Sequence, residues 1–310
     1  MMWQAKLDSA LLSLGAASLL TLAGCGDTGS SATGDIEVSV AANEAVRVGF
    51  PHTEEGFGEL AFVDDWSVTI DTFVVSIQRF ELLELTNEGD GSVEASWGGA
   101  SLLDIAAEED GDVQLGMMSD VPEGRYDIRF ELSPPDSSTM AANIPSELSE
   151  TMVANGWSLY VKATATPGAG HPEFSEPITL DLGMDLNATY FDCNNGADGT
   201  KGFVVIGNSV SEAYIYPHIV HLFWDNLGAG DEELRFDAMA RAAGEDRVLT
   251  IEELDTVDLT APELAGPDGI PLYDDAGLLD EYTLGAYVRR AMLESFHFNG
   301  IGFCKKTLGN

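Results

Sequence analysis

Three residues in one short segment have the types and spacing of metal ligands. His218, His221 and Asp225 lie at positions i, i+3 and i+7, so a helix would place all three on one face. Imidazole binds zinc, copper, iron or nickel, and a carboxylate can complete such a set. His297, seven residues before Cys304, is a fourth candidate. We therefore predict one divalent ion, zinc or another transition metal, held by His218, His221, Asp225 and His297.

The same segment has a second interpretation, in which the histidines are structural and only hydrogen-bonded. Pro217 precedes the segment, and apolar residues that favour an extended chain separate the candidate ligands: Ile219, Val220, Leu222, Phe223 and Trp224. If a metal is bound, four protein ligands favour a structural role, whereas three ligands and a water favour catalysis. In a metal-dependent hydrolase, an acid such as Asp237 would be the general base.

Other enzyme signatures are scarce in the sequence. It contains no His-Glu-x-x-His, no Gly-x-Ser-x-Gly and no phosphate-binding glycine loop, so nucleophilic and phosphoryl chemistry lack candidates and we name no catalytic residue. Residues 192–199 (Asp-Cys-Asn-Asn-Gly-Ala-Asp-Gly) offer oxygen ligands for calcium, but a turn beside a disulfide is the favoured interpretation. The acidic run at residues 108–112 is typical of a solvated loop.

The first of the three cysteines has the context of a lipidation site. Cys25 follows Leu22-Ala23-Gly24 at the end of an apolar stretch that starts at Ala10, and Lys6 lies before it. Residues 1–24 resemble the signal peptide of a bacterial lipoprotein precursor. The resemblance implies cleavage before Cys25 and acylation of this residue, which would anchor the chain to the outer membrane, with the protein in the periplasm or on the cell surface. An ordinary secretory signal is the alternative.

The remaining cysteines, Cys193 and Cys304, would then lie outside the cytoplasm. Oxidising surroundings favour a disulfide between them. Two buried free thiols are the alternative.

Composition narrows the choice of partners. The chain has 53 acidic and 14 basic residues and a net charge of −39, which repels nucleic acid and anionic lipid headgroups. Hydrophobic residues make up 45% of the sequence, enough for a folded core. No later apolar run is long enough to span a bilayer, so we expect a membrane partner only through Cys25, together with an unknown protein or small-molecule ligand.

Hydrophobic periodicity predicts a β-rich fold. Alternation typical of strands occurs at residues 36–40, 46–50, 66–82, 126–132, 159–166, 178–182 and 203–206, which indicates an antiparallel β-sandwich. Helical patterns occur at residues 146–154, 232–243, 250–254 and 278–296. We therefore expect a mainly β protein: signal peptide 1–24, flexible tether 25–35, β-sandwich domain 36–211, and a smaller helical C-terminal region 212–310 carrying the histidine-rich segment.

Several segments resemble a group of uncharacterised bacterial lipoproteins with transthyretin-like sandwich modules. The resemblance rests on residues 66–81, 102–105 and 121–130, and for the second half on 218–225, 234–237 and 249–254. It implies a lipid-anchored β-rich fold and no known reaction.

In such relatives the segment before residues 250–254 resembles an EF-hand loop. Here Glu253 would be the last ligand, but Ala242 and Gly244 occupy ligand positions and Arg247 stands where the turn glycine belongs. We expect a degenerate, metal-free EF-hand-like segment, with calcium less favoured than a transition metal. The sequence thus predicts a lipid-anchored binding or structural protein that holds a divalent metal. The alternatives are the hydrolase and a metal-free surface adhesion module.

Overall fold

The computed structural model describes residues 32–51, 60–107, 112–228, 230, 232–265 and 271–309. The fold is mainly β, with 43% strand and 17% helix, and Ala32–Asn310 forms one compact unit. Cys25, the signal segment 1–24 and most of the acidic run 108–112 lie outside the described residues.

The smaller sheet consists of β1 (Thr33–Ala41), β5 (Asp112–Pro122), β12 (Val210–Pro217) and β14 (Phe296–Phe298). The strand order is β14-β12-β1-β5. β1 runs parallel to β12 and antiparallel to β5, and β14 is antiparallel to β12. Strands from the two ends of the chain therefore lie in one sheet.

The larger sheet has eleven strands in the described part of the chain. They are β2 (Trp66–Glu84), β3 (Val93–Trp97), β4 (Ser101–Asp104), β6 (Gly124–Leu132), β7 (Met140–Ala141), β8 (Leu159–Pro167), β9 (Ile178–Met184), β10 (Ala188–Phe191), β11 (Phe203–Val205), β13 (Val248–Leu249) and β15 (Lys305–Leu308). The main path is β13-β9-β8-β2-β6-β10-β15; β3 and β4 pair with β2, β7 with β4, and β11 with β6.

The sandwich-like, mainly β fold is confirmed, but its sheets are mixed and not wholly antiparallel. β1–β12, β4–β7 and β9–β13 are parallel pairs. The separate helical region at 212–310 is not confirmed, because β12 and β14 complete the small sheet and β15 extends the large one. The predicted tether 25–35 ends earlier, since β1 begins at Thr33.

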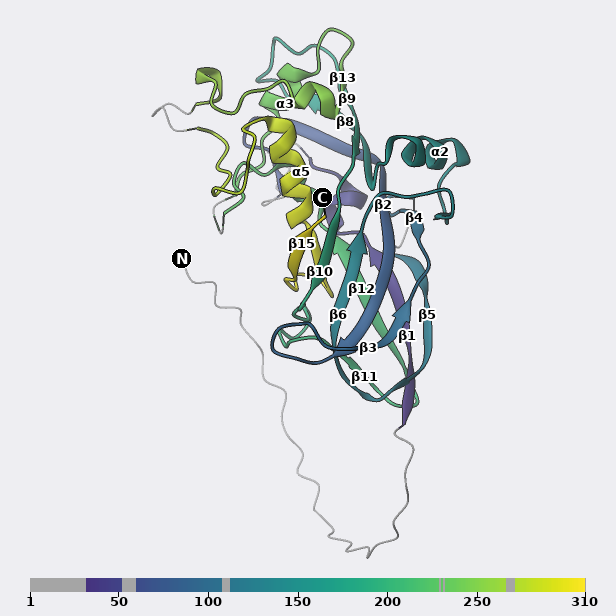
Figure 1. Ribbon diagram of the computed structural model, residues 1–310. Helices are drawn as coiled ribbons and strands as arrows, with labels where there is room; N and C mark the ends of the chain where they lie inside the picture. Colours follow the sequence, from purple (N-terminus) through teal and green to yellow (C-terminus); the bar gives the residue numbers. More distant parts are fainter. Residues whose placement is uncertain are drawn as a thin grey trace, which may run out of the picture. The chain divides into compact units, whose positions relative to one another are not determined.

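Helices cover parts of the sheets and connect them. They are α1 (Glu44–Val48), α2 (Ser146–Asn155), η3 (Ile219–Phe223), α3 (Asp237–Ala242), α4 (Ile251–Leu254), η4 (Pro262–Leu264) and α5 (Leu284–Glu294). In α5 the buried residues follow helical spacing: Leu284, Tyr287, Val288, Ala291 and Met292. Figure 1 shows α3 close to β13, β9 and β8, whereas β11 lies near the other end of the sheets.

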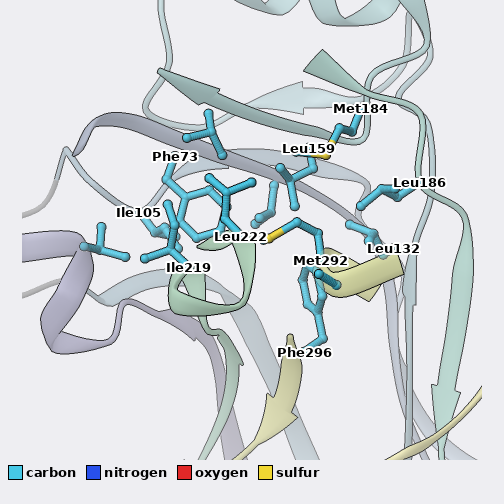
Figure 2. Packing of buried hydrophobic residues seen from close by; sticks show 14 of the residues in the cluster. Phe73, Ile105, Leu132, Leu159, Met184, Leu186, Ile219, Leu222, Met292 and Phe296 are labelled. Carbon is cyan, nitrogen blue, oxygen red and sulfur yellow. The ribbon is translucent and has the colours of Figure 1, made fainter. Parts of the chain in front are cut away.

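The helices share a core with the large sheet. Figure 2 shows Leu222 of η3 and Met292 of α5 together with Phe73 of β2 and Leu159 of β8. All four side chains have no exposed surface or almost none. Burial of each such side chain stabilises the fold by about 1.5–3 kcal/mol, so these helices belong to the sandwich core.

A disulfide joins Cys193 to Cys304, as the sequence predicts. Cys193 follows β10 and Cys304 precedes β15, which are paired strands. Next to the bond, Asp192 accepts hydrogen bonds from Lys201 (2.5 Å) and Lys305 (2.7 Å). The loop 192–199 thus uses the side chain of Asp192 for ion pairs and that of Asp198 to hold Thr200.

We expect Asp192→Asn to lower the free energy of unfolding at pH 7 by about 1–2 kcal/mol. Burial raises the pKa of Asp192, but hydrogen bonds from Lys201 and Lys305 outweigh this and lower the pKa below 3.8. The ionised form therefore stabilises the fold above pH 3.8, and this contribution disappears as the pH falls through the lowered native pKa. Asparagine tolerates the positive φ of 51° at this position.

Urea unfolding of both proteins at pH 7 and near pH 3 tests this expectation. The difference between Asp192→Asn and the unsubstituted chain should shrink at the lower pH. A difference of equal size at both values would show that the charge of Asp192 contributes nothing.

Candidate functional site

His218 and His221 are brought together by a turn of 3₁₀ helix. β12 ends at Pro217, His218 caps η3, and His221 N–H donates to the His218 carbonyl (3.2 Å). A 3₁₀ helix has three residues per turn, so side chains at i and i+3 lie on the same side. The two imidazole centroids are 6.1 Å apart.

His297 joins them from the neighbouring strand. β14 places His297 opposite Tyr216 of β12, and His218 N–H continues the ladder by donating to the Ser295 carbonyl (3.0 Å). His297 and its partner Tyr216 lie on the same face of the strand pair. His218 follows Tyr216 by two residues, and side chains two residues apart on a strand share a face, so the His218 and His297 side chains lie on the same side. The His297 centroid is 4.7 Å from that of His218 and 5.7 Å from that of His221.

Backbone carbonyls fix the protonated nitrogen of each ring. His218 Nε2 donates to the Gly300 carbonyl (3.1 Å). His221 and His297 are bonded to the carbonyls of Ala291 and Gly302, and these bonds come from Nε2 because their buried Nδ1 atoms have no partner among the described residues. All three rings therefore carry the proton on Nε2, and Nδ1 keeps a lone pair.

Burial keeps these rings neutral. It lowers the pKa of His221 to about 2, helped by His297, His218 and Lys306, and that of His297 to about 4, helped by His218 and Lys306. Burial also lowers the pKa of His218. Neutral imidazole is the form that binds metal. Lys306, whose positive charge disfavours protonation of His221 and His297, is ion-paired with Glu294.

The spacing of the three rings suits a single metal ion. With a zinc–nitrogen distance of about 2.0–2.1 Å and tetrahedral angles, the centroids of two bound imidazoles lie about 5 Å apart. However, no three His, Cys, Asp or Glu side chains of the described residues are already arranged around one point. The rings would have to turn for their Nδ1 atoms to converge.

Asp225 is not part of this cluster. η3 ends at Phe223 and Trp224 is extended, so the helical spacing assumed for Asp225 does not continue. Asp225 Oδ1 instead accepts from Glu233 N–H (2.9 Å), and Oδ2 accepts from Arg235 Nε (2.6 Å). The buried carboxylate of Asp225 therefore stabilises the chain between Asp225 and Arg235 through these two bonds.

Asp237, the candidate base, lies in a second polar cluster. Its Oδ1 accepts from Trp66 Nε1 (2.9 Å) and lies 3.5 Å from His171 Nδ1. Its backbone N–H donates to Asp64 Oδ2 (2.8 Å). Asp64 and His171 were not predicted as site residues, because they lie 173 and 66 positions from Asp237 and match no motif.

The EF-hand-like segment has its side chains engaged in local structure. Glu253 and Thr250 form a capping box at the start of α4, and Asp246 accepts from Val248 N–H (3.2 Å). Arg247 has a φ of 59°, a left-handed conformation that glycine adopts at low cost.

Comparisons with known protein families, with curated proteins and with solved structures find no match for this chain. Within the described residues, no helix has the length and apolar character needed to cross a membrane.

Proposed function

We propose that this protein is a lipid-anchored, extracytoplasmic binding protein that holds one divalent transition metal on His218, His221 and His297. The observation that carries the proposal concerns the buried Nδ1 atoms of His221 and His297, neither of which has a hydrogen-bond partner in the part of the chain that the structure describes. A buried acceptor without a partner costs about 1–3 kcal/mol. A metal ion would satisfy both atoms at once.

The carbonyls behind the three rings support this assignment. Metal-binding histidines usually donate their second N–H to a carboxylate or carbonyl, which fixes the tautomer and raises the basicity of the ligating nitrogen. Gly300, Ala291 and Gly302 supply such acceptors. An all-nitrogen set favours zinc or copper over calcium, which takes oxygen ligands.

Binding is better supported than hydrolysis. A catalytic zinc needs an open position for water, but His221 and His297 are only 4% and 5% exposed. The candidate base Asp237 is held by Trp66 and lies near His171. Anchoring is proposed from the sequence around Cys25, and β1 begins eight residues after that cysteine.

A metal-free adhesion module remains the second candidate because of an apolar surface beside the histidines. Ile301 and Phe303 are each 69% exposed, and the Phe303 ring is 5.1 Å from that of His297. An exposed aromatic of this kind is typical of contact sites for other proteins.

Metal analysis separates the two candidates. The chain from residue 26 onward, purified without a histidine tag and loaded with zinc, should hold about one equivalent of metal by mass spectrometry. His218→Ala/His221→Ala should hold almost none, because one remaining imidazole gives weak binding. His171→Ala and Asp225→Asn are the controls and should keep the metal.

Retention of one equivalent by the double variant would place the metal elsewhere. No metal in any of these proteins, with folding intact by circular dichroism, would leave the adhesion module as the better account.

A further inference from the structure

The connection between β8 and β9, residues 168–177, contacts the core mainly through one titratable side chain. The structure describes every residue of this connection, and His171, 8% exposed, is the only one of them that is buried. Its imidazole ring packs against two aromatic rings, with centroid distances of 5.1 Å to Trp66 of β2 and 6.1 Å to Phe174. The charge of His171 therefore bears directly on how this connection is held.

Both ring nitrogens of His171 face hydrogen-bond acceptors. Nε2 is bonded to the Asp64 carbonyl, and Nδ1 lies 3.5 Å from Asp237 Oδ1 and 3.6 Å from Glu173 Oε1. A carbonyl and an ionised carboxylate can only accept, whereas neutral imidazole carries a single N–H. Only the imidazolium form can therefore donate on both sides. A neutral ring would leave one nitrogen lone pair facing an acceptor.

The charged groups around the ring favour this protonated form. Burial lowers the pKa of His171, but the hydrogen bond to the Asp64 carbonyl and the charges of Asp237 and Glu173 outweigh it and raise the pKa above 6.5. The contacts of the imidazolium are therefore fully present below pH 6.5 and are lost as the pH rises through the raised pKa. The other charged groups packed around the connection are Asp65, which accepts from Gly170 N–H (3.3 Å), Arg241, 3.7 Å from Asp237 Oδ2, and Arg247, 3.3 Å from Glu176 Oε2.

A cavity of about 360 Å³ is lined both by this connection and by the segment that contains α3. Glu173 and Phe174 line it from the connection, and Ala240, Ala243 and Gly244 line it from α3 and the turn that follows. Asp237 near His171 Nδ1 is the first residue of α3, and Phe174 N–H donates to the His171 carbonyl (3.1 Å). His171 thus joins the two walls of this cavity.

We propose that His171 is a pH-sensitive latch on this cavity. The imidazolium holds residues 168–174 to Asp237 of α3, and loss of its proton releases this wall of the cavity. The far end of the connection stays attached, because Arg247 donates to the Glu176 carbonyl (3.2 Å). The latch shares no residue with the histidine cluster, so it stands independently of the proposed metal site.

Hydrogen exchange of the chain from residue 26 onward tests the proposal. It is followed by mass spectrometry near pH 5.5 and near pH 8.5 and corrected for the intrinsic exchange rate. The peptide to follow covers residues 168–174, in which the N–H groups of His171 and Phe174 donate to the carbonyls of Gly168 and His171 (3.2 and 3.1 Å). Its protection should fall by about tenfold at the higher pH, the effect of losing one hydrogen bond to a charged group.

Glu173→Gln isolates the electrostatic part of the latch. It removes one of the two carboxylates near Nδ1, so the midpoint of the protection change should move to lower pH. Glu176→Gln is the matched control, because this acid lies in the same connection and its side chain is 70% exposed, but its ion pair is with Arg247. The midpoint of this control should stay in place.

His171→Gln removes the titrating group itself and should show the low protection at both pH values. If this variant fails to fold, Glu173→Gln still decides, because the Glu173 side chain is 55% exposed. Equal protection of residues 168–174 at both pH values in the unsubstituted chain, a pH response that persists in His171→Gln, or a midpoint that Glu173→Gln and Glu176→Gln move equally would each overturn the proposal.

Discussion

Removal of the Cys193–Cys304 bond is expected to lower the free energy of unfolding by about 2–5 kcal/mol. The bond closes a loop across a sequence separation of 111 residues, and in the chain-entropy model a loop of this length contributes about 4.7 kcal/mol by restricting the unfolded chain. Urea unfolding of Cys193→Ala/Cys304→Ala against the oxidised chain measures the effect. The loss exceeds that of a typical single substitution.

The reduced, unsubstituted chain is the control for this comparison. It removes the cross-link without creating a cavity at Cys193, which is fully buried. If the reduced chain is as stable as the oxidised chain, the bond does not restrict the unfolded state.

The bond also bears on the histidine cluster. Gly300 and Gly302, whose carbonyls hold His218 and His297, lie on the segment between β14 and Cys304. Gly302 N–H bonds back to the Phe298 carbonyl (3.1 Å). Because the disulfide ties the end of this segment to β10, it preorganises two of the three carbonyl contacts.

The sequence predicted strands whose large apolar residues lie two apart, and it missed strands in which this spacing is broken or the buried residues are small. β6 and β8 were predicted because their apolar residues lie two apart. β5 was missed because its register against β1 shifts twice, so Leu115, Met118 and Val121 are spaced by three. β12 was missed because small residues, Ser211 and Ala213, form part of its buried face.

The segment 46–50 shows the opposite error. Val46, Val48 and Phe50 alternate, and the sequence therefore predicts a strand. The structure instead has α1, which buries Ala45 and Val46 and leaves Val48 51% exposed. A short apolar segment fits both periods, and packing against neighbouring elements decides between them.

Part of the candidate site could also be predicted from residue spacing, where the spacing gives the same arrangement in more than one local structure. A spacing of three brings His218 and His221 together in a 3₁₀ turn as well as in an α-helix, so that pair did not depend on the helix type. The prediction that Asp225 lies on the same face did depend on an α-helix. His297 is placed by strand pairing, which no local spacing reveals, and the cluster of Asp64 and His171 around Asp237 was not predicted at all.

Saturating zinc is expected to raise the free energy of unfolding by about 4 kcal/mol when its free concentration is a thousand times the dissociation constant. The reason is that the proposed site would form only in the folded chain, since His297 lies 76 positions from His221 and the pairing of β14 with β12 brings the two segments together. A metal that binds the folded state and not the unfolded one stabilises by mass action. Urea unfolding with and without zinc measures the gain.

The controls separate ligation from general ionic effects on a chain of net charge −39. Magnesium at the same concentration screens the same charges but prefers oxygen ligands, so it should give little of the gain. A chelator should return the zinc-loaded chain to its original stability. His297→Ala should lose most of the zinc response, whereas Asp225→Asn, though destabilised by the loss of its ion pair with Arg235, should keep it. An equal gain with zinc and magnesium, undiminished in His297→Ala, would mean that the ions act on the acidic surface and that the three histidines do not form a metal site.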